Sequence, residues 1–62
     1  MALETRHVER QMLFNLLKAL HRDPELGKSR EFNDIIYSLK AVMEAEDVAL
    51  VNEQIQELIR VS

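Results

Sequence analysis

Apolar side chains recur at intervals of three and four residues along most of this 62-residue chain, and this spacing limits the possible folds more than any other feature. An α-helix brings residues with that spacing to one face, so each stripe predicts an amphipathic helix. The chain holds only one Gly and one Pro, which leaves little material for β-hairpin turns. The stripes are Val8, Met12, Leu13, Leu16, Ala19 and Leu20; then Phe32, Ile35, Ile36, Leu39, Val42 and Met43; then Val48, Val51, Ile55, Leu58 and Ile59. The sequence therefore predicts an all-α fold.

The first break between stripes falls at residues 22–28, which contain both the Gly and the Pro. Asp23 followed by Pro24 suits the N-cap and first position of a single helical turn. Gly27 can adopt a positive φ angle in this connection. We expect the second helix to start near Ser29, because serine is a good N-cap residue.

Neither Gly nor Pro marks the second break, which is predicted from a change in the helical phase of the apolar stripes. The second and third stripes would point in different directions on one straight helix. A turn or kink around residues 44–47 resolves this, with Asp47 as the expected N-cap. The alternative is one long bent helix from Ser29 to Arg60. With the break, residues 1–62 form a single helical domain with helices at about 3–21, 29–45 and 47–60.

The small size of the chain points to self-association. A chain of this length buries a modest core, and it has no Cys to form disulfides. Burying a further apolar face against another subunit would add the missing stability. Apolar residues outside the stripes are predicted to form a dimer or partner interface: Leu3, Phe14, Leu17, Leu50 and Val61. We therefore expect two or three short amphipathic helices forming a hairpin or bundle, completed by homodimerisation.

Charge is unevenly distributed along the chain, which carries a net charge of −3. Residues 1–30 carry a net +2 and residues 31–62 a net −5, so the two halves can attract each other within a fold or across a dimer. Four basic residues project from about one side of the first helix and are candidates to contact an anion or a partner: Arg6, Arg10, Lys18 and Arg22. The alternative function is thus a small DNA-associated transcriptional regulator, although the negative net charge argues against phosphate binding.

Signatures of catalysis and of metal binding are weak in this sequence. His7 and His21 are about four helical turns apart and cannot bind one ion from the same helix. The acidic residues at 44–47 lack the Gly and the alternating spacing of a calcium-binding loop. No Gly-rich phosphate loop and no paired-carboxylate constellation is visible. We expect a non-enzymatic protein with no cofactor and no metal.

Membrane attachment is not predicted either. The first six residues already include charged Glu4 and Arg6, and no apolar segment of a secretory signal follows. Uninterrupted apolar runs such as Met12 to Phe14 are short, and the longest, Val48 to Val51, has four residues, far short of a transmembrane helix. We expect a cytoplasmic protein.

The stretch from Glu25 to Ile59 resembles the small enterobacterial biofilm and acid-resistance regulators of the AriR (YmgB) type, also called two-component connector proteins. The resembling residues are Leu26, the run Ile35-Ile36-Tyr37-Ser38-Leu39, the acidic turn at 44–47, Val51, Ile55, Leu58 and Ile59. The resemblance implies an all-helical dimer that contacts other regulators without catalysis. The chain departs from that pattern in Lys40, where the family tends to have Glu, in the longer 22–28 connection and in its N-terminal region. DNA binding does not carry over, because no basic motif matches.

Together these features predict a small regulatory or adaptor protein that acts through its helical faces. Its expected partners are a second copy of itself and another regulatory protein. Nucleic acid is the weaker alternative, and no membrane is expected.

Overall fold

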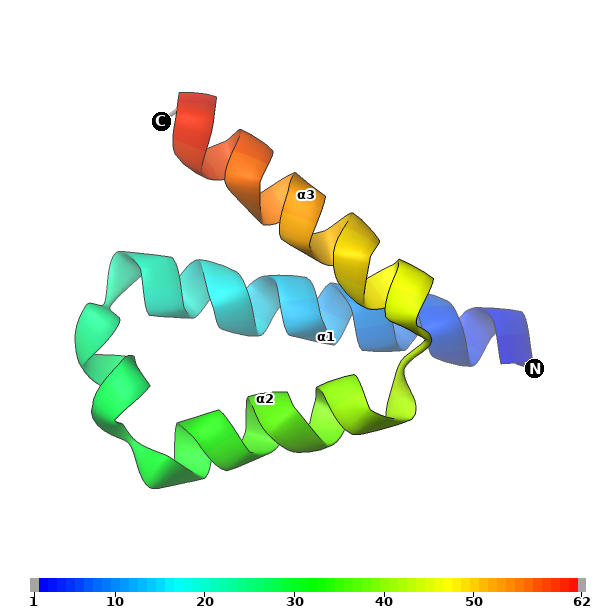
Figure 1. Cartoon of the computed structure of the whole chain (residues 1–62), viewed down its shortest axis with the longest axis horizontal. Coiled ribbons are helices and arrows are strands. Elements are labelled where there is room, and N and C mark those ends of the chain that lie inside the picture. Colours follow the sequence, from blue (N-terminus) through cyan, green and yellow to red (C-terminus); the bar gives the residue numbers. More distant parts are fainter. Residues whose placement is uncertain (1, 62) are drawn as a thin grey trace.

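The computed structural model describes residues 2–61, with side-chain environments for residues 5–61. The elements in order are α1 (Ala2–Arg22), the short 3₁₀ helix η1 (Pro24–Lys28), α2 (Arg30–Val42) and α3 (Ala45–Val61). Figure 1 shows α2 running back alongside α1, while α3 crosses in front of the N-terminal half of α1 and then diverges from it. The all-α prediction is confirmed, and the alternative of one long bent helix from Ser29 to Arg60 is wrong.

The connection between α1 and α2 is held by its caps. The Asp23 carboxylate accepts a hydrogen bond from the backbone N–H of Glu25 at 3.2 Å, with Pro24 in the first turn of η1. The Ser29 hydroxyl accepts a bond from the N–H of Phe32 at 3.2 Å and so caps α2, as predicted. Gly27 does not have a positive φ angle, because η1 continues through it with helical backbone.

The α2–α3 junction is two residues long. The second helix ends at Val42, earlier than predicted, and Met43 is extended with φ −90° and ψ 152°. The Glu44 carbonyl accepts bonds from the N–H groups of Asp47 and Val48 at 3.0 and 3.1 Å. The prediction of Asp47 as N-cap is therefore wrong, because Asp47 lies within the first turn of α3. The early end of α2 lets Met43, only 9% exposed, turn into the core.

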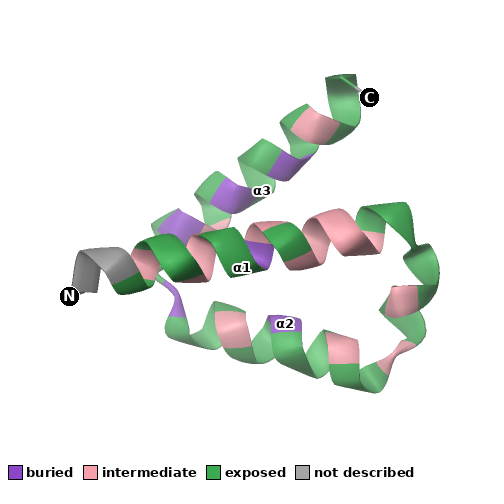
Figure 2. Ribbon diagram, turned by 180° about the vertical axis from the view of Figure 1, so that it is seen from behind, coloured by how far each residue is buried: buried purple, intermediate pink, exposed green. Residues whose placement is uncertain are grey.

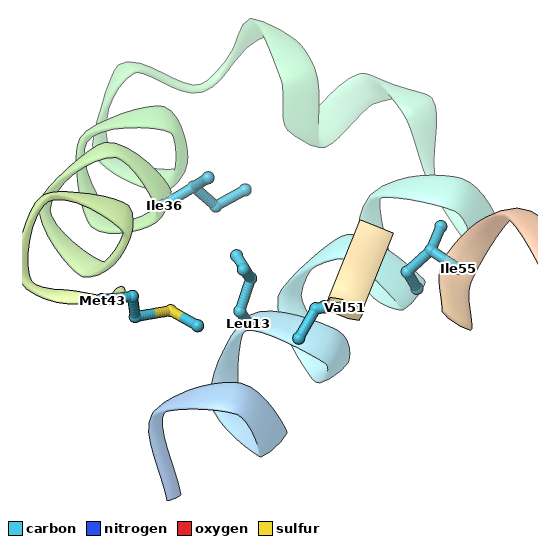
Figure 3. Packing of buried hydrophobic residues seen from close by; sticks show 5 residues of the cluster. All are labelled: Leu13, Ile36, Met43, Val51 and Ile55. Carbon is cyan, nitrogen blue, oxygen red and sulfur yellow. The ribbon is translucent and has the colours of Figure 1, made fainter. Parts of the chain in front are cut away.

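The core is centred on Leu13, which is fully buried in the middle of α1. Figure 3 shows Leu13 between Ile36 and Met43 on one side and Val51 and Ile55 of α3 on the other. Partly buried side chains surround this cluster: Phe14, Leu16, Leu17, Phe32, Leu39 and Val48. α1 is thus the common wall against which both α2 and α3 pack.

The molecule exposes more surface than its mass predicts. Its accessible surface is 4816 Å² at 7.3 kDa, whereas a folded monomer of that mass has about 4,200 Å². Its radius of gyration is 11.8 Å, against about 10.6 Å for an average globular chain of this length. The excess arises because α3 leans away from α1 at its C-terminal end and the molecule is flat, measuring 35 × 29 × 15 Å.

Candidate functional site

An ion pair between the start of α1 and the start of α3 fixes where the two helices cross. Arg6 Nε donates to Asp47 Oδ2 at 2.9 Å, and Arg6 Nη2 donates to Asp47 Oδ1 at 3.1 Å. The same Nη2 donates to Glu46 Oε1 at 2.9 Å. The Asp47 side chain is only 6% exposed, whereas Glu46 is 77% exposed, so Asp47 is the buried partner of the pair.

Hydrogen bonding makes this pair strongly ionic. The bonds from Arg6 lower the pKa of Asp47, against the opposing effect of burial, and the charges of Arg6 and Arg10 lower it further. The bonds to Asp47 and Glu46 in turn raise the pKa of Arg6. Both groups are therefore charged at neutral pH, and the bidentate geometry of the two hydrogen bonds fixes their relative orientation.

Beyond this crossing point the two helices diverge and enclose an open groove of about 810 Å³, here named the α1–α3 groove. Its lining residues follow the spacing i, i+3, i+4 and i+7 on each helix, so each helix contributes one continuous face. They are His7, Arg10, Gln11 and Phe14 of α1 and Gln54, Glu57, Leu58 and Val61 of α3. Phe14, Leu58 and Val61 give the groove its apolar surface, and polar groups lie on both walls.

The charged residues that line the groove differ in how completely they are paired. Arg10 Nε is buried and lies 4.0 Å from Asp47 Oδ1, too far for a hydrogen bond, and it has no hydrogen-bond partner in the described structure. Glu57 on the opposite wall is already paired with Arg60, whose Nη2 lies 2.8 Å from Glu57 Oε2. Because the hydrogen bonds of Asp47 come from Arg6, Arg10 is the less completely paired charge in the groove. A bound ligand would therefore meet the positive charge of Arg10 more readily than the negative charge of Glu57.

Two of the five predicted interface residues, Phe14 and Val61, line this groove. Leu50, 38% exposed, falls on the same side of α3, because Leu50 and Val61 are eleven residues and thus about three turns apart. Leu17, like Phe14, is half-buried and packs against the core cluster, but Leu17 does not line the groove. The side chain of Leu3 lies outside the described residues.

The predicted basic row does not form one open patch. Arg6 is bonded to Asp47 and Glu46, and Arg10 faces Asp47 from 4.0 Å. Lys18 is half-buried, and Arg22 is exposed in the last turn of α1. The oppositely charged halves of the chain attract each other within the fold at this point, where Arg6 and Arg10 meet Asp47. The charge asymmetry along the chain predicts this attraction, but it does not predict which acid pairs with which basic residue.

The described residues hold neither a metal-binding cluster nor a membrane-spanning helix. No group of three or more His, Asp and Glu side chains within them is placed to hold a metal ion. Within residues 2–61, none of the helices combines the length and apolar content that crossing a bilayer requires.

Comparison of the chain with family models, with curated proteins and with solved structures found no match. The resemblance to the AriR-type regulators stays a prediction.

Proposed function

We propose that this chain is a small non-catalytic adaptor of the cytoplasm that binds an amphipathic helix of another, regulatory protein. The observation that carries the proposal is the α1–α3 groove, in which each of two helices contributes one row of side chains. Phe14, Leu58 and Val61 form the apolar surface that a ligand would contact. Two diverging helices lack the third wall that a helical bundle normally has. A partner helix lying between them would bury its apolar face in the manner of helix-in-groove recognition.

The charges define the partner more closely. Arg10 lines the groove with a side chain that is 32% exposed, while Glu57 is paired with Arg60. A partner helix with an acidic side chain beside its apolar stripe would pair with the part of the Arg10 guanidinium that the groove exposes. We therefore propose an acidic amphipathic helix as the occupant, with two or three apolar residues against Phe14 and Val61.

Self-association is part of the same proposal. The accessible surface exceeds that of a typical monomer by about 600 Å². A pair of subunits that covers this excess would complete the hairpin as a homodimer. Direct DNA binding finds less support, because Arg6 and Arg10 face Asp47, and the remaining Lys18 and Arg22 do not make a dense basic surface.

The proposal can be tested without knowing the natural partner. A displayed library of amphipathic helical peptides, selected against the folded protein, should yield binders enriched in Glu or Asp next to the apolar stripe. Phe14→Glu should weaken the selected peptides at least tenfold in fluorescence anisotropy, because it places a charge on the apolar surface of the groove. Tyr37→Glu is the matched control, since Tyr37 is 79% exposed on α2 and does not line the groove. Failure to obtain binders, or binders that ignore Phe14→Glu, would exclude this groove as the binding site.

A further inference from the structure

Four aliphatic side chains on α1 and α2 are left open to solvent. Val8 is 53% exposed and Met12 48% on α1, while Ile35 is 52% and Val42 68% exposed on α2. Each belongs to an apolar stripe that the sequence assigns to a core face, yet none is buried by its own chain. Large aliphatic residues that remain exposed together on a small protein mark an interaction surface.

These four residues share one face of the α1–α2 hairpin. Met12 precedes the buried Leu13 by one position, and Ile35 precedes the buried Ile36 by one position, so each is turned about 100° from its core neighbour in the same rotational sense. Because α1 and α2 run in opposite directions, the same sense on both helices leads to the same side of the hairpin. Val8 lies one turn before Met12, and Val42 two turns after Ile35, which extends the patch along both helices.

The third helix lies on the other side of α1. Phe14, which follows Leu13, lines the α1–α3 groove, so the rotation that leads to Met12 leads away from α3. Figure 1 shows α3 crossing in front of α1, and Figure 2 looks from behind onto the two hairpin helices with α3 beyond them. We name the surface formed by Val8, Met12, Ile35 and Val42 the hairpin face.

We propose that a second copy of this chain docks on the hairpin face, so that two hairpins pack face to face about a two-fold axis. This inference rests on the proposed self-association and assigns its surface. A two-fold interface brings each patch against the same patch of the other subunit, which suits a surface whose most exposed side chains are aliphatic. Uncharged Ser38 and half-buried Leu39 lie between Ile35 and Val42 in sequence. The half-buried Glu9 lies between Val8 and Met12, and the exposed Glu31 lies one turn before Ile35.

The area supports a second copy as the occupant. The molecule is only 15 Å thick along its shortest axis, so no further layer of the described residues covers the hairpin on the side away from α3. The accessible surface of the whole chain exceeds that of an average monomer by about 600 Å², and one partner contributes about 600–800 Å² to a stable interface. The α1–α3 groove is a poorer candidate for this self-contact, because a two-fold contact there would bring the Arg10 side chains of both subunits into the same interface.

This arrangement has a consequence for function. Because α3 lies opposite the hairpin face, dimerisation there leaves both α1–α3 grooves open on the outer sides of the dimer. The dimer is then bivalent and would bind a partner that carries two acidic helices more tightly than a single helix, through effective concentration.

Sedimentation equilibrium over a concentration series tests the assignment. The wild-type chain should sediment as a dimer at tens of micromolar, and both Ile35→Glu and Val42→Glu should raise the dimer dissociation constant at least tenfold. Two variants are used because Val42 is the more exposed and the less exposed Ile35 adjoins the core, and circular dichroism checks that each remains helical. Val61→Glu, a groove residue that is 72% exposed, is the control and should remain dimeric.

The possible outcomes separate the two proposals. A wild-type dimer that persists in Ile35→Glu and Val42→Glu overturns the hairpin face as the interface but leaves self-association standing. A folded wild-type monomer at all concentrations overturns self-association and the hairpin-face interface together. Peptide binding in the groove is measured separately and is decided by Phe14→Glu, so it stands or falls independently of both results.

Discussion

Arg6 of α1 and Asp47 of α3 lie 41 positions apart in sequence and form a bidentate ion pair with hydrogen bonds of 2.9 and 3.1 Å. The pair fixes the crossing of the two helices from which the α1–α3 groove opens. Its loss would free α3 to change its angle to α1, and the width of the groove would change with it. The stability and the binding of this protein are therefore linked through one carboxylate.

Stability should depend on pH through Asp47. Because its pKa in the folded chain is lowered by Arg6, its contribution is fully present above its ordinary pKa of about 3.9 and is lost as pH falls through the lowered value. Urea unfolding of the wild type should therefore show a falling midpoint below about pH 4. Asp47→Asn should lower the midpoint at pH 7 and flatten this acid dependence. Glu57→Gln is the control, because Glu57 is 62% exposed, and an equal effect of both variants would contradict the role given to Asp47.

The core depends most on Leu13, which contacts both flanking helices. Leu13→Ala should cost about 2–5 kcal/mol, because it removes buried methyl groups and leaves a cavity. A domain of this size has about 3–5 kcal/mol in total, so the variant should be largely unfolded by circular dichroism at 25 °C. Tyr37→Ala should change the free energy of unfolding by less than about 0.5 kcal/mol, since Tyr37 is exposed. A well-folded Leu13→Ala protein would show that the helices do not meet at this residue.

How much of this could be read from the sequence differs from element to element. Ser29 and Asp23 cap their helices as the local rules require, because N-capping depends on neighbouring residues only. The predicted end of α2 is wrong because Met43 leaves the helix and packs in the core. The predicted N-cap role of Asp47 is wrong because Asp47 lies inside the first turn of α3, where its carboxylate binds Arg6. Both contacts are tertiary, and stripes and capping residues carry no information about them.

In the candidate site, too, some residues could be predicted from the sequence and others depend on tertiary contacts. Phe14 and Val61 stood out as apolar residues beyond their stripes, and both line the groove. Leu17 stood out in the same way but packs on the core, because the core face of α1 must serve two partner helices and is wider than one stripe. Conversely, Met12 and Ile35 belong to core stripes but are half exposed, since α3 crosses on the other side of α1.

Gly27 offers a stabilising substitution. Its φ angle is not positive, and a methyl group added there would meet Leu20 Cδ1 at 3.5 Å, an ordinary van der Waals distance. Gly27→Ala should therefore raise the free energy of unfolding by about 0.4–1 kcal/mol, mainly by reducing the entropy of the unfolded chain. Chemical denaturation at a fixed protein concentration measures it. A loss of stability would indicate that the connection between α1 and α2 needs a backbone conformation open only to glycine.

The Ser29 cap should also be measurable. Ser29→Ala removes the acceptor for the Phe32 N–H and should cost about 1 kcal/mol. Ser29→Asp should retain most of the stability, because aspartate is an equally good N-cap residue. Thermal unfolding followed at 222 nm compares the two, and equal losses in both variants would point to a role of Ser29 other than capping.

The central claim, an acidic helix bound beside Arg10, is tested most directly by a double-mutant cycle. Binding of a selected acidic peptide is measured for wild type and Arg10→Gln, each with the parent peptide and with its acidic residue changed to Gln. The account predicts that Arg10→Gln weakens the acidic peptide at least fivefold but has little effect on the neutral one. Equal losses for both peptides would contradict the account, because they would show that Arg10 shapes the groove without contacting the acidic side chain.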